Sequence, residues 1–480
     1  MFVINHTSDF MISSLLTSVL LPIVFSLPIY LIGRRNKKLA GILSFLILTV
    51  SGMLLLIRIP SISNGQTIIE KYSWVESIDL RFDFLADKLS LPIASVITFL
   101  SGFAALASVA YLEKKRGHGT YYFFLLLFAA GMIGLVLATN LLQFYIFWEM
   151  MIIPSFFLIG GWGYKKPWRI AIKYFLWMRV GGLCLLFAIL WLYTLTGSFD
   201  INVIQQATIG ENLIWIASLF ILAFLIKMAV IPFHNWLPDA HSEAPTPISA
   251  MLSGAMIKVG VYGIVRLVLG MFSSPTNWMF WLSGLGAITM LYGAILALMQ
   301  KDIKRLLAYS SISQMGLILF GIMAANMGLA GALFHVINHA ICKGLLFLGA
   351  GALVYRLGMR DMTKMGGLFR KMPITAVSMI LAAVSLSATP PLSAFVSELM
   401  IVGGGMEAGY NIFVMIVLIS SILTAGYFLW MTYKIFFGKL PKQFNQIKEA
   451  PLTFAIPLIL LSVPIVIFGI WPELVLEVIT

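Results

Sequence analysis

Long apolar runs recur along the whole chain, and they limit the fold more than any other feature. A bilayer core of about 30 Å is crossed by about 20 helical residues, because each residue adds about 1.5 Å. Backbone polar groups at that depth must be satisfied within the segment, and these runs lack the alternation of barrel strands. We therefore predict an all-α integral membrane protein with about 14 transmembrane helices, at 11–33, 39–57, 89–110, 121–139, 141–162, 172–195, 213–233, 247–269, 277–298, 306–325, 331–355, 375–403, 411–437 and 452–476.

The strong positive charge is explained by membrane topology rather than by a nucleic-acid surface. The formal net charge is +13 although only 11% of the 480 residues are charged. Of the 32 Lys and Arg residues, 23 fall in the loops after predicted helices 1, 3, 5, 9, 11 and 13, whereas the loops at 196–212, 270–276, 326–330 and 404–410 contain none. By the positive-inside rule, the basic loops face the cytoplasm and both termini lie outside. This pattern predicts a multi-pass protein of the cell (inner or plasma) membrane that binds no nucleic acid.

Two predicted helices are interrupted in a corresponding way. Helix 7 carries Lys227 and then Pro232, and helix 12 carries Pro390 and Pro391 before Glu398. Proline breaks the helical hydrogen-bond ladder, so backbone carbonyls at membrane depth need other partners. Helices 7 and 12 are five helices apart, so a five-helix repeat would place the two breaks at equivalent positions. Because five is an odd number, the two copies of the repeat cross the membrane in opposite directions. Broken helices in inverted repeats point to an ion path. We predict one membrane domain over 1–480, with helices 1–3 at 1–120, a first repeat (helices 4–8) at 121–269, a second repeat (helices 9–13) at 277–437 and helix 14 at 452–476.

Seven of the ionisable side chains inside the predicted membrane helices suggest a pathway. Each costs at least about 2.5 kcal/mol at a helix centre if it faces lipid without a partner. Any one of them is equally well explained as a contact that holds helices together, or for a histidine as a satisfied core residue. As a set they coincide with both proline breaks, which favours a proton path. The set is Glu149, Lys227, Lys258, His335, His339, Lys343 and Glu398.

The spacing of these residues suggests how a proton would move. We expect Glu149 to pair with Lys227. At about 4 Å and an effective dielectric constant of about 20, such a pair is worth roughly 4 kcal/mol, so separating it is enough to displace a proton. His335, His339 and Lys343 are spaced at i, i+4 and i+8, which places them on one helical stripe. Histidine exchanges protons near neutrality and so suits a relay.

No cofactor, metal or redox centre is predicted. Cys184 and Cys342 are the two cysteines, and they form no CxxC pair or thiolate set for an iron–sulfur cluster. Asp239, His241 and Glu243 share a turn after helix 7 but lack the ligand spacing of a zinc site. The chain also shows no nucleophile–base set or nucleotide loop, so an enzyme acting alone is the least favoured class.

Four stretches resemble a known family. They are "LIKMAVIPFHNWLPDAHSEAPTPISAMLSGAMIKVGVYGIVR", "FWEMMIIPSFFLIGGWG", "LAYSSISQMG" and "PPLSAFVSELMI". They closely resemble the antiporter-like subunits of respiratory complex I, of its hydrogenase and sulfur-reducing relatives, and of Mrp-type cation/proton antiporters. The resemblance covers helices 4 to 13 and implies fourteen helices with two inverted five-helix repeats, each with a broken helix.

The resemblance also implies roles for individual residues. Glu149 and Lys227 match the family's paired helix-5 glutamate and helix-7 lysine. Lys258 matches the central lysine of helix 8, and Glu398 matches the terminal ionisable group of helix 12. The connecting residues found on helix 11 of some members are matched by His335, His339 and Lys343.

Within the family the resemblance is mixed. Glu398 and "LPDAHSEAPT" are most similar to the M-type subunit of complex I, whereas the helix-11 set is closer to L-type and Mrp members. Gln314 stands where the pattern would give histidine. The resemblance implies a proton-translocating subunit of a redox-driven complex of the NADH-quinone oxidoreductase, hydrogenase or sulfane reductase type. The alternative is a subunit of an Mrp-type Na+/H+ antiporter without a redox partner.

The partners implied by the resemblance are other membrane subunits. They include further antiporter-like subunits and a hydrogenase-like or quinone-binding module. Protons are the expected transported ion, with Na+ as the other candidate. A structural scaffold whose buried charges merely hold helices together is the remaining alternative, and it predicts that neutral variants lose assembly rather than transport.

Overall fold

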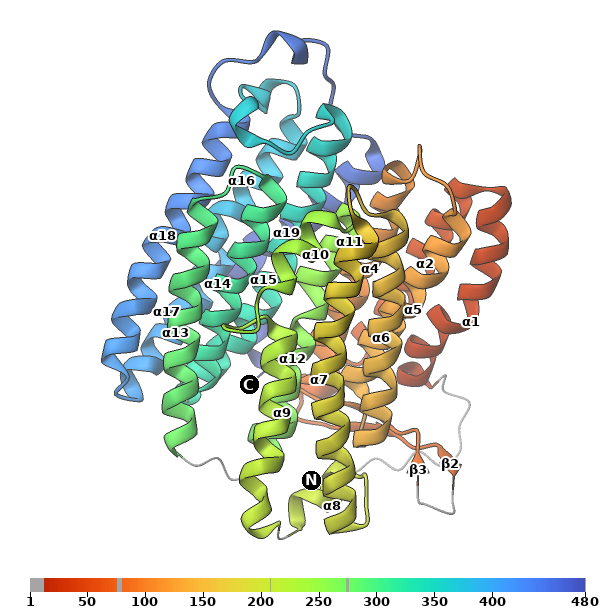
Figure 1. The fold of residues 1–480 in the computed structure, drawn as a ribbon, viewed down its shortest axis with the longest axis vertical. Helices are drawn as coiled ribbons and strands as arrows, with labels where there is room; N and C mark the ends of the chain where they lie inside the picture. Colours follow the sequence, from red (N-terminus) through yellow and green to blue (C-terminus); the bar gives the residue numbers. More distant parts are fainter. Residues whose placement is uncertain (1–12, 76–79, 208, 273–275, 480) are drawn as a thin grey trace.

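The computed structural model describes residues 13–75, 80–207, 209–272 and 276–479, and this part of the chain is overwhelmingly α-helical. Thirteen of its helices are long and apolar enough to cross a membrane. One further crossing consists of two shorter helices, because the chain breaks between α16 (Pro373–Leu386) and α17 (Ser393–Glu407). Figure 1 shows the long helices side by side along the length of the molecule. The predicted all-α membrane fold with about 14 crossings is therefore confirmed.

The N-terminal part contains three long helices and a segment that the sequence did not reveal. The long helices are α1 (Ser14–Arg35), α2 (Lys37–Leu56) and α4 (Ser90–Tyr111). The predicted loop at 58–88 contains the short α3 (Ile59–Ser63) and two antiparallel pairs, β1 (Ile68–Glu70) with β4 (Phe84–Ala86) and β2 (Ser73–Val75) with β3 (Leu80–Arg81). Strands of two or three residues are too short to show a period of two, so alternation could not predict them.

The remaining helices follow the predicted order. The first half comprises α5 (His118–Leu137), α6 (Leu141–Trp162), α7 (Pro167–Thr196), α8 (Ile201–Gln206), η2 (Gly210–Asn212), α9 (Leu213–Met228), α10 (Trp236–Glu243), α11 (Thr246–Met251), the π-helix η3 (Leu252–Met256), α12 (Lys258–Gly263) and the π-helix η4 (Ile264–Leu269). After it come α13 (Thr276–Leu298), α14 (Ile303–Ile322), α15 (Asn326–Leu357), η5 (Met362–Lys364), η6 (Leu368–Arg370), α16, α17, α18 (Asn411–Phe436), η7 (Lys442–Phe444), α19 (Leu452–Ile470) and α20 (Glu473–Ile479).

A repeated backbone framework relates the two halves. Asn140 forms an isolated antiparallel bridge with Asp200, and Asp302 forms the same kind of bridge with Asp361. The side chains of Asn140 and Asp302 also cap the first turns of α6 and α14. In Figure 1 the first bridge belongs to the end that carries α8, whereas the segment joining α15 to α16 lies at the opposite end. The same framework is thus used in opposite directions, as inverted repeats require.

Both helix breaks also share a backbone conformation. Ala229 (φ 55°) ends α9 and Ala388 (φ 51°) follows α16, and each stands in the left-handed region three residues before a proline, Pro232 or Pro391. Alanine adopts this region at a cost of roughly 1–2 kcal/mol, so the two breaks are enforced by the surrounding fold. α9 ends at Met228, earlier than the predicted limit of 233, because the chain turns before the proline.

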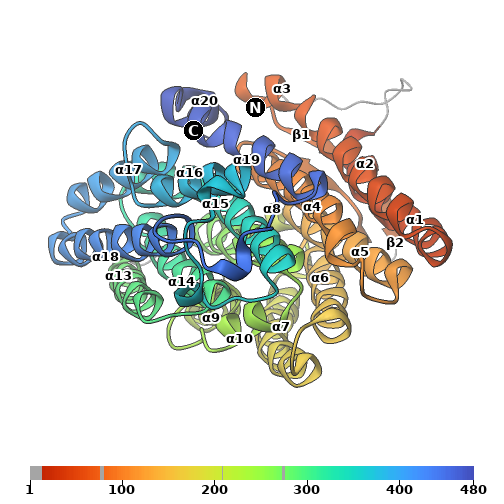
Figure 2. The ribbon, with the colours of Figure 1, turned by 90° about the horizontal axis from the view of Figure 1, so that it is seen from above.

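α15 occupies the middle of the molecule. It packs against α4, α11, α14, α16, α17 and α19. The view from above shows it among α4, α14, α16, α17 and α19 (Figure 2). Every residue from Phe334 to Leu353 is buried. Polar side chains on this helix are therefore isolated from solvent and must find partners on neighbouring helices.

Candidate functional site

Lys258 lies at the centre of the site, at the start of α12 and between the two π-helices. Only 1% of it is exposed. Its Nζ donates to the backbone oxygen of Ser253 and lies 2.6 Å from His339 Nδ1 on α15. The predicted lysine and the predicted histidine are therefore in direct contact, although 81 positions separate them in the sequence.

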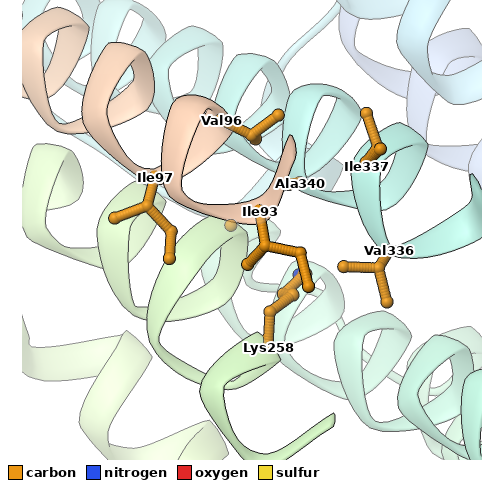
Figure 3. A pocket seen from close by; sticks show the side chains of 8 residues that line it. Ile93, Val96, Ile97, Lys258, Val336, Ile337 and Ala340 are labelled. Atoms are coloured by element: carbon orange, nitrogen blue, oxygen red, sulfur yellow. The ribbon is translucent and has the colours of Figure 1, made fainter. Parts of the chain in front are cut away.

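One side of Lys258 is closed by apolar residues. Figure 3 shows a small pocket beside its stem, formed by side chains of α4 and α15. Polar contacts of the ammonium group therefore lead away from α4, toward Ser253 and His339. The pocket is lined by Ile93, Val96, Ile97, Gly254, Lys258, Val336, Ile337 and Ala340.

His335 continues the polar connection one turn away on α15. Its ring and that of His339 are stacked with centroids 6.2 Å apart. His335 Nε2 lies 2.7 Å from Gln314 Oε1, and Nδ1 lies 2.9 Å from Ser397 Oγ. Gln314, which replaces the histidine of the family pattern, is thus a direct partner of the relay histidine.

Glu398 stands next to this connection, after the second helix break. Ser397, which contacts His335, is its neighbour in the sequence, and Asn338 of α15 donates to Ser397 Oγ at 3.1 Å. Glu398 is buried and accepts a hydrogen bond from Ser421 Oγ on α18. The structure therefore brings four predicted residues, Lys258, His339, His335 and Glu398, into one buried region.

Lys343 shares the predicted stripe of α15 but takes different partners. Its Nζ donates to Ser310 Oγ and, at 3.3 Å, to the Leu307 backbone oxygen, both on α14. It also lies 5.3 Å from the centre of the Phe428 ring. The structure thus joins Lys343 to α14 instead of extending the hydrogen-bonded line from His339.

The expected direct contact between Glu149 and Lys227 is wrong for this structure. Glu149 Oε2 lies 2.7 Å from Arg179 Nη1, on the neighbouring α7. Lys227 Nζ instead lies 4.7 Å from the centre of the Trp148 ring and 3.7 Å from Met178 Sδ. The long, planar guanidinium of Arg179 reaches the Glu149 carboxylate at the flank of the bundle, whereas Lys227 lies inside the bundle against the Trp148 ring.

Sequence reasoning passed over two arginines that the structure shows in buried or partly buried ion pairs. Arg179 lies in the interior of predicted helix 6, and a charged residue at that depth by itself indicates that a partner is needed. Arg266 of η4 binds Asp87, with Nη2 at 2.6 Å from Oδ2. Burial raises the pKa of the Asp87 carboxyl, but the charge and hydrogen bonds of Arg266 outweigh it and leave that pKa below its usual value.

Several buried polar atoms along this region have no hydrogen-bond partner among the described residues. Buried polar groups in proteins nearly always have partners, ordered water included. These atoms therefore mark where water is needed between the helices. They are Trp148 Nε1, Glu149 Oε1 and Oε2, Gln314 Nε2, Asn338 Oδ1, His339 Nε2, Ser393 Oγ and Tyr427 Oη.

The acidic turn after α9 has structural contacts. Asp239 lies 2.7 Å from Lys173 Nζ, and Glu243 accepts hydrogen bonds from the backbone N–H groups of Lys165 and Lys166. Within the residues that the structure describes, no group of three or more metal-ligating side chains is found. His241 stacks on Phe347 with ring centroids 4.7 Å apart.

Comparison with protein families identifies similar proteins over most of the chain. The family model described as "NADH:quinone oxidoreductase/Mrp antiporter, TM" matches residues 138–424. The match includes all seven predicted ionisable residues and both helix breaks.

Individual relatives and a solved structure agree with this match. The chain is 31% identical to the M-type subunit of the NADH-quinone oxidoreductase of Rickettsia prowazekii, with 96% of each chain covered. It is 35% identical to a Na(+)/H(+) antiporter subunit of Alkalihalophilus pseudofirmus, where the match covers 86% of this chain but only 55% of the relative. One chain of the archaeal membrane-bound sulfane sulfur reductase has a TM-score of 0.89 and 30% identity, covering 97% of this chain and 77% of that one.

Proposed function

Because this chain belongs to the family of NADH:quinone oxidoreductase and Mrp antiporter transmembrane subunits, we propose that it translocates protons within a complex I-related, redox-driven membrane complex. The near-complete coverage of both chains in the match to the M-type oxidoreductase subunit supports this assignment. The electron-transfer chemistry belongs to other subunits, including a hydrogenase-like or quinone-binding module. Further antiporter-like subunits complete the membrane part.

The observation that carries the proposal is the buried line of exchangeable groups through the middle of the bundle. Lys258 contacts His339, and His335 contacts Ser397 beside Glu398. Lysine, histidine and carboxyl groups all accept and release protons, and their burial prevents exchange with bulk water. Nitrogen atoms provide most of this line, whereas hard cations prefer oxygen ligands. A proton is thus the ion that suits it best.

The proposed route begins at Lys227 and ends at Glu398. Among the described residues no direct contact joins Lys227 to Lys258, but α9 and α12 pack closely at Gly260, where an added Cβ would lie 3.3 Å from Lys227 Cβ. Water between the two lysines would complete the step. From Lys258 the proton would pass through His339 and His335 to Glu398, and Lys343 would provide a branch toward α14.

We also propose the finer organisation predicted from the sequence. The repeats span 121–269 and 277–437, the protein lies in the cell membrane, and both termini are outside. The paired bridges at Asn140 and Asp302 support the repeats, and the basic loops support the orientation.

The test of the function is a Lys258→Met variant of the native complex in sealed vesicles. Removing the central exchangeable group should reduce proton pumping per electron-transfer event by about a hundredfold. Lys301→Met provides the matched control, because Lys301 lies in a connecting segment outside the line. Normal pumping by an assembled Lys258→Met complex would rule out the proposed route.

A second candidate function is favoured by the 35% identity to a Na(+)/H(+) antiporter subunit. In that case the chain would exchange sodium against protons without a redox partner. Purifying the native assembly through a tag on this chain distinguishes the two. Co-purification of iron–sulfur, hydrogenase-like or quinone-binding subunits supports the redox-driven complex, whereas an assembly of membrane subunits alone supports the exchanger.

A further inference from the structure

Glu149 lies between two cations that belong to different helices. Its Oε2 is bound by Arg179, at 2.7 Å from Nη1. Trp148 precedes Glu149 in the sequence, and Lys227 Nζ lies over the Trp148 ring at 4.7 Å from the centre. Both carboxylate oxygens of Glu149 are buried and have no hydrogen-bond partner among the described residues. Arg179 thus binds the carboxylate as an ion pair without a hydrogen bond, so Glu149 can still accept a hydrogen bond from another donor.

The two cations differ in their exposure. The side chain of Arg179 is 36% exposed and that of Glu149 is 16% exposed, so their pair lies at the flank of the bundle. Lys227 is fully buried. The carboxylate therefore stands at the boundary between the flank and the interior.

The environment of Lys227 lacks a fixed counter-charge. Within the described chain it contacts Met178 Sδ and the Trp148 ring but forms no ion pair. A buried ammonium without a carboxylate is costly, and Glu149 is the carboxylate next to its aromatic contact. Glu149 also has room near α7, because Gly182 faces Oε1 and an added Cβ there would approach it to 3.2 Å.

We propose that Arg179 is a positioning residue that competes with Lys227 for Glu149. The carboxylate then alternates between Arg179 at the flank, whose charge is permanent, and Lys227 inside, which can lose its proton. Arginine keeps its charge in both arrangements because it does not lose its proton in proteins. The exchange therefore leaves a single group, Lys227, free to release or accept a proton. This inference rests on the proposed function and names the group that competes for Glu149.

Two variants at position 179 test the inference in the native complex. Arg179→Gln removes the competing cation, and we expect proton pumping per electron-transfer event to fall about tenfold, as for loss of one partly buried ion pair. Arg179→Lys keeps a cation and should recover most of the pumping. Arg169→Gln is the control, since it removes an exposed arginine from the same helix but away from Glu149.

A double variant separates positioning from a general structural role. If Arg179 acts through Glu149, then Glu149→Gln and Glu149→Gln/Arg179→Gln should pump equally within about twofold, because their effects are not additive. Additive losses, or Arg179→Gln behaving like Arg169→Gln, would overturn the inference. If the Arg179→Gln complex fails to assemble, the test uses proton pumping by the Arg179→Lys complex. Near-normal pumping supports the requirement for a cation at position 179. A loss of pumping equal to that of Glu149→Gln overturns the inference.

The result is distinguishable from failure of the proposed function. If Lys258→Met abolishes pumping while Arg179→Gln matches its control, the proton route stands and the role of Arg179 is rejected. If Lys258→Met pumps normally, the proposed function itself fails.

Discussion

The two halves of the molecule share a backbone framework but carry different chemistry. Both contain the paired bridge and a left-handed alanine at the helix break. Yet Lys227 stands two residues before Ala229, whereas Leu386 stands two residues before Ala388. In the same way, Glu398 comes ten residues after Ala388, whereas the residue ten positions after Ala229 is Asp239, which binds Lys173.

The difference shows that the fold and the charges obey separate requirements. Backbone breaks are set by packing and by hydrogen bonds, which both halves need. The ionisable groups differ between the halves: the first half pairs Glu149 with Arg179, and the second half holds His335 and His339, which are stacked and bind separate partners. The repeat thus supplies two similar frameworks that carry different side chains.

The largest effect is expected from breaking the histidine line of the second half. His339→Leu removes the group in contact with Lys258 and should lower proton pumping about a hundredfold, as expected for loss of a proton-transfer group. Pumping by vesicles of the assembled complex measures this. His118→Leu is the control, because His118 begins α5 and lies outside the line. Equal pumping by both variants would show that the second half does not conduct through α15.

A smaller effect, on stability, is expected where the first half is anchored to the N-terminal strands. Asp87→Asn leaves Arg266 without its carboxylate and should lower the free energy of unfolding by about 2 kcal/mol, less than for a fully buried pair because both side chains are partly exposed. Thermal unfolding of the purified protein measures the loss. Because the pKa of Asp87 is lowered in the folded protein, its stabilising contribution is present above the unfolded-state pKa and disappears as pH falls through the folded-state pKa. A deficit that persisted unchanged at the lowest pH would contradict the ion-pair explanation.

The hydrogen bond between Gln314 and His335 provides a test within the second half. Gln314→Leu leaves His335 Nε2 without its partner and should cost about 1 kcal/mol in stability. Gln314→His restores a polar partner and should cost less. Thermal midpoints of the two variants provide the measurement. A larger loss for histidine than for leucine would mean that the Gln314–His335 contact is unimportant and that side-chain volume dominates.

The smallest effect tests the shared framework directly. Ala229→Gly and Ala388→Gly each relieve a left-handed alanine. Each should stabilise the protein by about 0.5 kcal/mol, because the relief exceeds the cost of the greater chain entropy that glycine gives the unfolded state. The two gains should be similar if the breaks are equivalent. Ala350→Gly, inside α15, is the control and should destabilise the protein. A gain at one break alone would show that the two breaks are strained to different extents.

Much of this protein could be predicted from local sequence. The membrane helices, both proline breaks and the seven buried ionisable groups were identifiable because hydrocarbon thickness and the cost of burying charge act on each segment separately. Glu149, Lys227 and Lys258 stand out in this way without any knowledge of their neighbours. The orientation and the proton route stay predictions.

Only the tertiary structure decided which groups meet. Three kinds of contact join segments that are distant in the sequence or lie on different helices: Lys258 with His339, Glu149 with Arg179 rather than Lys227, and the backbone bridges of Asn140 with Asp200 and of Asp302 with Asp361. Hydrogen bonds and ion pairs are decided by differences of about 1 Å between helices. Local composition determines which residues need partners, whereas helix packing selects the partner.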